Sequence, residues 1–247
     1  MRDFKLSDIE FLVISLPAEV TRKRNIEQQF SQKLPNCQWR FIDGVLGKAL
    51  TLPIYEYDAR KRLREHDRDL TLGEIGCFMS HRLTWQHCVN TQKVCVVLED
   101  DVLIQDDFLE ALQAAMSIAD QWDIFRLHGI TEKPHKDLFA IGQHQIFLNL
   151  RDPGSAAAYL VQPRSAEALL AHSERFWLPV DDFMETPWNH HQKTLAIRPY
   201  PVQTAGFETT IPYRKPIRGA VFKRVARELF RMPDGVKRLI WRFKNRV

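Results

Sequence analysis

A short apolar run that ends in consecutive acids is the feature that most constrains this chain. Residues 94–98 are all apolar and rich in valine, and Glu99, Asp100 and Asp101 follow directly. Continuous apolar runs of this length are typical of strands that are buried on both faces of a parallel sheet. The run therefore predicts a central strand of an α/β protein, with the acids at the carboxyl end of that strand.

Strands and helices alternate along the first half of the chain. Apolar runs predict strands at residues 10–16, 38–42, 94–98 and 123–127. Helices are predicted at residues 21–33, 71–89 and 108–119. Thr71 and Glu74 have capping-box spacing at the start of the second helix. This alternation predicts a Rossmann-type α/β sandwich with a mostly parallel central sheet, in which ligands bind beyond the carboxyl ends of the strands.

The second half predicts shorter elements. Two strands, 145–150 and 156–161, are expected to be joined by a turn at Asp152-Pro153-Gly154. A short helix is predicted at 165–172, a loop with two acids at 179–183, and a proline-rich strand region at 196–202. The charged residues 60–69 predict a solvated helix or loop. Residues 1–212 are assigned to one catalytic domain.

The three acids after the central strand predict a metal site. Repulsion and desolvation make adjacent buried carboxylates costly unless a cation neutralises them. Mg²⁺ and Mn²⁺ prefer carboxylate oxygens and usually share their ligand shell with substrate phosphates. In an extended segment Glu99 and Asp101 point to one side, whereas Asp100 points away and hydrogen-bonds elsewhere or rotates in with the turn. The alternative is that the acids cap the next helix, but Asp106 and Asp107 are better placed for that.

The cysteine spacing and the hydropathy argue against a zinc-binding protein and against a membrane-spanning one. Cys37, Cys77, Cys88 and Cys95 form no Cys-x-x-Cys pair, so reduced thiols are expected and a zinc site is not. No apolar run approaches the roughly 18 residues of a spanning helix, and residues 11–16 are too short for a signal peptide. We therefore expect a cytoplasmic protein.

The C-terminal segment, residues 213–247, predicts a basic amphipathic tail. From Arg214 to Val247 there are 12 basic and two acidic residues, a balance of +10, which leaves 4 − 10 = −6 for the rest of the chain. Two apolar stripes at helical spacing flank Pro233, which separates them: Val221, Phe222, Val225 and Leu229, then Val236, Leu239, Ile240 and Phe243. Such helices bind anionic membrane surfaces. The alternative is that the stripes pack on the domain.

Several motifs resemble those of a known family. They are Val13-Ile14-Ser15-Leu16, Phe41-Ile42-Asp43-Gly44, Leu72-Gly73-Glu74-Ile75-Gly76-Cys77 with Ser80-His81 and Trp85, Val97-Leu98-Glu99-Asp100-Asp101, Gly154 to Tyr159, and Pro179-Val180-Asp181-Asp182-Phe183. Together they resemble the bacterial lipopolysaccharide glycosyltransferases of family 25, the group of the lipooligosaccharide β-galactosyltransferases. Around Asp43 the chain departs from the Asp-Ala-Val-Asp-Gly common in that family.

The resemblance implies a nucleotide-sugar-binding GT-A-like fold and inversion at the anomeric carbon. It implies a UDP-hexose donor, with UDP-galactose favoured and UDP-glucose the alternative, together with Mn²⁺ or Mg²⁺. The implied acceptor is a lipid-linked lipooligosaccharide, so the enzyme is expected on the inner face of the cytoplasmic membrane.

Candidate roles follow for individual residues. Asp181 and Asp182 are the candidate catalytic bases, although one of them can cap a helix that starts near Phe183. Glu99, Asp101 and His191 are the candidate metal ligands, with His190 as the alternative to His191. The donor is assigned to Ser15, Pro17, Asp43, Gly73, Glu74, Ser80, His81, Glu99 and Asp100. The alternative for the residues from Gly73 to His81 is a buried hydrogen-bonded network between helix and sheet.

Two other classes of function are alternatives. A metal-dependent nucleotidyltransferase needs a glycine-rich loop near its first strand, but no glycine precedes Gly44. A nucleic-acid-binding protein would use the basic tail, yet it would leave the acidic cluster unexplained. We therefore expect no nucleic-acid partner.

Overall fold

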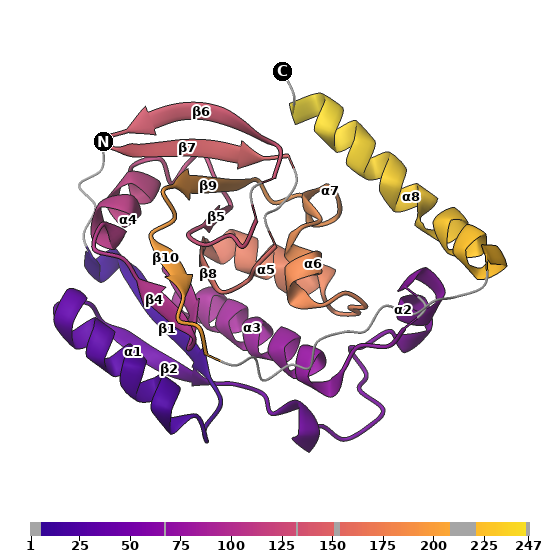
Figure 1. Ribbon diagram of the computed structural model, residues 1–247, viewed down its shortest axis with the longest axis horizontal. Coiled ribbons are helices and arrows are strands. Elements are labelled where there is room, and N and C mark those ends of the chain that lie inside the picture. Colours follow the sequence, from indigo (N-terminus) through magenta and orange to yellow (C-terminus); the bar gives the residue numbers. More distant parts are fainter. Residues whose placement is uncertain (1–5, 67, 132, 151–153, 208–220, 246–247) are drawn as a thin grey trace.

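A computed structural model describes residues 6–66, 68–131, 133–150, 154–207 and 221–245. Its centre is an eight-stranded sheet in the order β2-β1-β3-β8-β5-β9-β7-β6 (Figure 1). The strands of this sheet are β1 (Ile9–Ser15), β2 (Trp39–Asp43), β3 (Val94–Glu99), β5 (Ile124–Arg126), β6 (His135–Ile141), β7 (His144–Asn149), β8 (Ala158–Val161) and β9 (Thr194–Arg198). A separate antiparallel pair is formed by β4 (Val102–Ile104) and β10 (Val202–Thr204).

The large sheet is mixed but mostly parallel, as predicted. β1 pairs in parallel with β2 and β3, and β5 pairs in parallel with β9. β8 runs antiparallel between β3 and β5, and β7 runs antiparallel between β9 and β6. Apart from β7 and β8, the strands of this sheet therefore point in one direction, and their carboxyl ends form one edge.

Helices cover both faces of the sheet. On one face α1 (Val20–Lys33) and α4 (Phe108–Ser117) enclose a core with alternate strand residues such as Phe11 and Val96. On the other face α3 (Leu72–Thr91), α5 (Pro163–His172) and α6 (Val180–Met184) pack on the intervening residues, such as Leu12 and Val97. Because successive strand residues point to opposite faces, one apolar strand serves both cores.

The start of α3 is held close to the chain that follows β2. The predicted capping box is confirmed, since Thr71 and Glu74 bond each other's backbone N–H groups. A Cβ on Gly76 would lie 2.5 Å from the Val45 carbonyl oxygen, and one on Gly47 (in the 3-10 helix η2, Gly47–Ala49) would overlap the Leu72 carbonyl. These glycines therefore permit a close approach between the backbone of α3 and the chain after β2.

Three predicted elements differ in the structure. Residues 145–150 and 156–161 do form strands, β7 and β8, but β5 and β9 lie between them in the sheet. Their expected turn at Asp152 and Pro153 lies outside the described residues. The acids at 181 and 182 lie in the first turn of α6 and not in a loop. The charged segment forms α2 (Ala59–His66), in which Arg62 is fully buried.

The C-terminal helix α8 (Val221–Asn245) runs through Pro233 without a break, so the predicted separation into two segments is wrong. An interior proline removes one backbone hydrogen bond and crowds the preceding turn, which costs about 3 kcal/mol, but here it does not end the helix. α8 contacts α2 and α7 (Pro187–His190), and Arg242 donates to the Leu150 carbonyl. Among the described helices, none carries an apolar stretch sufficient to span a bilayer.

The apolar stripe of α8 faces away from the domain. Val236, Leu239, Ile240 and Phe243 are all more than half exposed, with Leu239 at 69% and Phe243 at 76%. Trp188 and Asn189 of α7 hydrogen-bond Asp234 on the other side of the helix, at 2.8 and 2.7 Å. The alternative that this stripe packs on the domain is therefore wrong for residues 236–243. The side chains at 221–229 lie outside those described.

Candidate active site

The acidic motif lies at the carboxyl edge of the sheet, beside the end of β1. Asp100 is buried there between two residues of the β1–α1 region. The Ser15 hydroxyl donates to its Oδ2 at 2.6 Å, and the Arg22 guanidinium donates to its Oδ1 at 3.0 Å. Asp100 thus hydrogen-bonds elsewhere than Glu99, as predicted for the middle acid, but the same Arg22 nitrogen also lies 3.6 Å from Asp101. Ser15 holds Asp100, and Pro17 lies exposed in the turn after β1.

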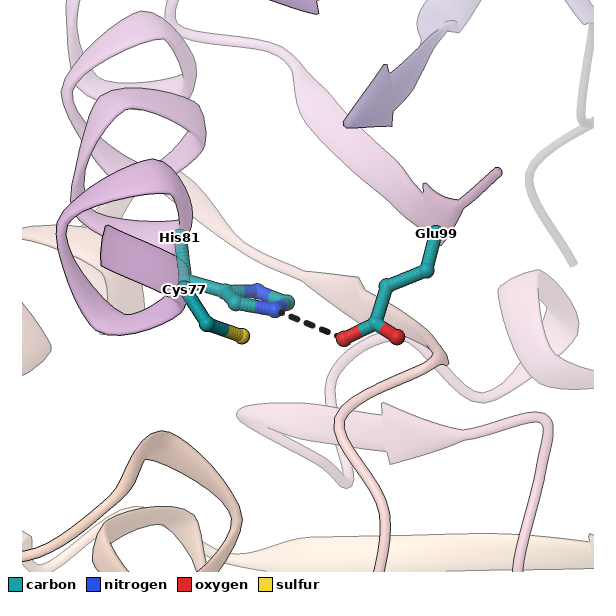
Figure 2. A group of neighbouring side chains, drawn as sticks. All are labelled: Cys77, His81 and Glu99. Atoms are coloured by element: carbon teal, nitrogen blue, oxygen red, sulfur yellow. Dashed lines mark hydrogen bonds and ion pairs between the residues drawn. The ribbon is translucent and has the colours of Figure 1, made fainter. Parts of the chain in front are cut away.

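Glu99 points the other way, toward α3. Figure 2 shows the side chains of Cys77 and His81 directed from α3 toward Glu99, with His81 Nε2 at 3.3 Å from Glu99 Oε1. His81 Nδ1 lies 2.9 Å from the Tyr159 hydroxyl, which also accepts from the Trp85 indole N–H at 2.9 Å. A neutral His81 satisfies every contact when Nδ1 accepts from Tyr159 and the Nε2–H donates to Glu99.

Asp101 and Asp181 complete an acidic site around Glu99. Burial and the charge of Glu99 raise the pKa of Asp101 to about 6, although Arg22, 3.6 Å away, opposes this rise. Burial and Glu99 likewise raise the pKa of Asp181 to about 6, against the influence of His81. Three carboxylates from β3, the following turn and α6 therefore share one partly desolvated site. Such a site favours a bound cation.

Asp182 is adjacent to Asp181 but interacts with other charged groups. Burial raises the pKa of Asp182, and the charges of Arg62, Arg68 and Arg231 oppose that rise. Asp182 also lines a groove beneath α8. The two candidate bases are thus separated by their position on α6, and Asp181 is the one coupled to the acidic site.

Two ligand sets could hold a metal ion at Glu99. Ligand atoms of Cys77, His81 and Glu99 lie within 4.8 Å of one another. The second set is the oxygens of Glu99 and Asp101. Burial and the nearby acids raise the pKa of the Cys77 thiol, which disfavours the thiolate form that binds metals. His81 presents an N–H to Glu99 in the tautomer above. Both features favour the oxygen set for a hard cation such as Mg²⁺ or Mn²⁺.

The predicted histidine ligands are not brought to this site by any described contact. His190 is fully buried, with Nε2 toward the Met184 carbonyl and Nδ1 accepting from the Gln192 N–H. Burial lowers its pKa to about 3, so it is a neutral structural residue. His191 follows α7 with φ at 58°, and its ring packs against His172. Its role as a ligand stays a prediction.

Other predicted donor residues are engaged in local structure. The Glu74 carboxylate belongs to the α3 capping box, and the Ser80 hydroxyl donates to the Gly76 carbonyl and accepts from the Val45 N–H. These contacts favour the buried-network alternative for both. Asp43 ends β2, is exposed and lies 3.9 Å from Lys23. Gly73 lies in the first turn of α3. Contact of Asp43 or Gly73 with a nucleotide stays a prediction.

Three neighbours of the site were not assigned roles from sequence. Tyr159 and Cys77 lie in recognised motifs, but only the fold brings them to His81 and Glu99. His128 is buried with Nδ1 2.8 Å from the Ser155 hydroxyl, and burial lowers its pKa while the charge of Glu99 opposes that effect. It follows β5, so the rule that ligands gather at strand ends could have found it.

Comparison with known proteins identifies related chains. Procollagen galactosyltransferase 1 of Danio rerio is 29% identical over 198 residues, which cover 74% of this chain and 32% of that protein. Lipooligosaccharide biosynthesis protein lic2B of Haemophilus influenzae is 29% identical over 202 residues, covering 76% and 73%. A probable inactive glycosyltransferase 25 family member 3 of Rattus norvegicus is 28% identical, covering 76% and 34%. The chain thus spans about a third of the length of these two animal relatives.

A solved structure, a glycosyltransferase involved in glycosylation of the major capsid of PBCV-1, matches 91% of this chain and 98% of that chain at a TM-score of 0.36 and 8% identity. That likeness is too distant to carry an argument. The model of glycosyltransferase family 25 (LPS biosynthesis protein) matches residues 8–184, a span that contains Ser15, His81, the acidic motif and Asp181. The chain belongs to glycosyltransferase family 25.

Proposed function

We propose that this chain is an inverting, metal-dependent enzyme that transfers a hexose, with galactose favoured, from a UDP-sugar to a lipooligosaccharide acceptor. The observation that carries the proposal is the acidic site in which Glu99 raises the pKa of both Asp101 and Asp181. Nearby positive charge comes from Arg22, which is already bonded to Asp100. A cation with a diphosphate would balance the remaining negative charge.

The residues present fit Mn²⁺ or Mg²⁺. Glu99 and Asp101 offer hard oxygen ligands at the edge where nucleotide ligands of α/β sheets bind. Once bound there, the cation would offset the charge that develops on the departing UDP. His81 holds the Glu99 carboxylate through its Nε2–H, and Tyr159 and Trp85 hold the His81 ring in turn. These hydrogen bonds, which reach Glu99 through His81 of α3, orient its carboxylate toward the metal site.

Asp181 is our candidate for the general base. It lies beside the donor site, and a pKa of about 6 makes it an effective proton acceptor near neutral pH. The acceptor hydroxyl would give its proton to the Asp181 carboxylate while its oxygen bonds the anomeric carbon. The bond between that carbon and the UDP oxygen breaks on the opposite face, so the configuration inverts and UDP leaves with the electron pair.

The names of two relatives support the choice of substrates. One is a procollagen galactosyltransferase, which favours galactose, and another is a lipooligosaccharide biosynthesis protein, which favours a lipooligosaccharide acceptor. UDP-glucose remains the alternative donor. Other relatives are named as inactive members, so activity itself must be measured.

A donor screen with matched variants tests the proposal. Purified protein is incubated with UDP-galactose, UDP-glucose and their N-acetyl forms, each with Mn²⁺ or with chelator, and released UDP and pyrophosphate are measured. We expect UDP release from UDP-galactose that needs Mn²⁺, is lost in Asp101→Asn and persists in Cys77→Ser. Activity in chelator would contradict the metal role. If Cys77→Ser loses Mn²⁺ binding and Asp101→Asn does not, the metal ligands would be Cys77, His81 and Glu99. Release of pyrophosphate would indicate a nucleotidyltransferase.

We also propose that α8 docks the enzyme on the inner face of the cytoplasmic membrane. The exposed stripe of Val236, Leu239, Ile240 and Phe243 supports this, because apolar side chains on a basic helix insert into anionic lipid surfaces. The +10 balance of residues 214–247 adds electrostatic attraction. A lipid-linked acceptor would then be reached at the surface where it is anchored.

A further inference from the structure

A groove of about 590 Å³ lies between α8 and the domain. Its walls come from α2, from the region of α6 and α7, and from the inward side of α8. In Figure 1 the yellow α8 extends from α2 past α7 toward the β6–β7 end of the sheet, and the α8 residues that line the groove fall between Phe230 and Arg242. The volume falls within the range of about 300–1,000 Å³ that is usual for small-ligand sites.

Aromatic rings and cations alternate along the groove walls. The Lys61 ammonium lies 3.1 Å above the centre of the Trp177 ring, and the Arg238 guanidinium lies 6.0 Å from the centre of Trp188. Lys237 also lines the groove, 3.3 Å from the Asn189 side-chain oxygen. Flat aromatic faces suit the apolar faces of sugar rings, and neighbouring ammonium and guanidinium groups suit phosphate or carboxylate. The lining contains six Lys or Arg residues and four acids, so its net positive charge favours an anionic saccharide.

The groove adjoins the acidic site through α6. Asp182 lines the groove, while Asp181, the next residue along the helix, is coupled to Glu99. Glu185 also lines the groove, and a Cβ on Gly154, in the segment before β8, would lie 3.2 Å from its carboxylate. The groove and the acidic site are thus bordered by consecutive residues of α6.

We propose that this groove binds the acceptor, an oligosaccharide that carries phosphate or carboxylate groups. Its anionic groups lie near Lys61, Lys237 and Arg238, and its sugar rings lie beside the indoles of Trp177 and Trp188, each of which has one face covered by a cation. The inference rests on the proposed function, since it names the second substrate of the same site. The apolar stripe lies on the outer side of α8, so the helix would place the groove next to the lipid that anchors the acceptor.

Binding of deacylated lipooligosaccharide, measured by calorimetry, tests the groove. The same material after removal of its phosphates, and inorganic phosphate alone, serve as comparison ligands. The groove variant is Lys61→Gln/Lys237→Gln. The matched control, Lys193→Gln/Lys244→Gln, removes the same charge from exposed residues that do not line the groove. Melting temperatures confirm that both variants fold.

We expect the groove variant to bind the phosphorylated oligosaccharide at least about tenfold more weakly, because charge-assisted hydrogen bonds are lost, and the control to change less than about twofold. The KM for acceptor should rise in the groove variant and stay within about twofold of the wild-type value in the control. Equal binding by both variants would overturn the proposal, as would equal affinity for dephosphorylated material or for inorganic phosphate. Groove-dependent binding without any UDP-sugar turnover would support the groove and reject the proposed reaction.

Discussion

Adjacent acids in this chain have different partners and therefore different chemistry. Asp100 is bonded to Ser15 and Arg22, whereas Glu99 faces His81 on the other side. The divergence of Asp100 was predictable, because neighbouring residues of an extended segment point to opposite sides. The partners were not predictable, since Ser15, His81 and Tyr159 reach the motif from 85, 18 and 60 residues away and only the fold brings them together.

The same separation between Asp181 and Asp182 gives a direct test of the base. Asp181→Asn should lower kcat by about 10²–10⁴, the usual contribution of a general base, with little change in the KM for UDP-hexose. Asp182→Asn is the matched variant, and its kcat should stay within about tenfold because this acid faces Arg62 and the groove. Steady-state kinetics with saturating donor measure both. If Asp182→Asn lost more kcat than Asp181→Asn, Asp182 and not Asp181 would be the general base.

Protonation of the acidic site should be visible in the stability of the metal-free protein. The folded pKa values of Asp101 and Asp181, about 6, exceed their ordinary value of 3.8, so the folded state binds more protons between about pH 4 and 6. The unfolding free energy therefore falls as pH rises through this window. Above it both carboxyl groups are ionised, and the folded state carries the full destabilising penalty of their charges. Mn²⁺ should offset the penalty at pH 7.5, because it binds the ionised carboxylates.

In chelator at pH 7.5, Asp181→Asn should raise the melting temperature by roughly 2–4 °C for each kcal/mol of penalty removed. The gain should shrink at pH 5, where the wild-type carboxyl is protonated. Asp43→Asn, at an exposed position, serves as the control. Scanning fluorimetry at both pH values measures the difference. A lower melting temperature for Asp181→Asn at pH 7.5 would mean that the carboxylate is well compensated without a cation.

At the scale of elements, strong local signals predicted structure and weak ones did not. The apolar run of β3 and the capping box of α3 carry their own evidence in sequence, and both are confirmed. β6 is an edge strand whose residues are half-buried or exposed, so it lacks an alternating apolar pattern and was missed. β8 runs antiparallel between parallel strands, which depends on long-range packing. α2 buries Arg62 near Asp182, a charge pairing that composition alone cannot reveal.

The contact between α3 and the chain after β2 predicts different outcomes for two glycines. Gly76→Ala should cost about 1–3 kcal/mol, because its Cβ would overlap the Val45 carbonyl at 2.5 Å. Gly235→Ala in α8 meets no atom within 4 Å and should stabilise the helix by up to about 1 kcal/mol. Urea denaturation of the two variants checks both signs. A neutral Gly76→Ala would show that the loop after β2 moves without cost.

For the whole molecule, the orientation of α8 is the feature that sequence left open. Helical spacing predicted an apolar stripe, but either side of an amphipathic helix can face a domain. Here hydrogen bonds from α7 to Asp234 and the packing of Trp188 near Trp241 hold the polar side inward. The apolar side is consequently left exposed on a strongly basic segment.

This orientation predicts that the stripe contributes to lipid binding and not to folding. Leu239→Ser/Phe243→Ser should weaken co-sedimentation with anionic vesicles by at least about tenfold, since burying each such side chain contributes about 1.5–3 kcal/mol. The melting temperature should hardly change, because both side chains are mostly exposed. Ile130→Ser, at a residue 68% exposed outside α8, is the control. Unchanged sedimentation of the double variant would remove the membrane role of α8.

The location of a metal and nucleotide tests the central claim most directly. Crystals soaked with Mn²⁺ and UDP can be measured at the manganese absorption edge, where an anomalous peak marks the ion. We predict one peak within about 2.0–2.3 Å of a Glu99 or Asp101 oxygen, bridged to the diphosphate and absent from Asp101→Asn crystals. Nucleotide density remote from these carboxylates, or bound UDP without manganese beside it, would contradict the account.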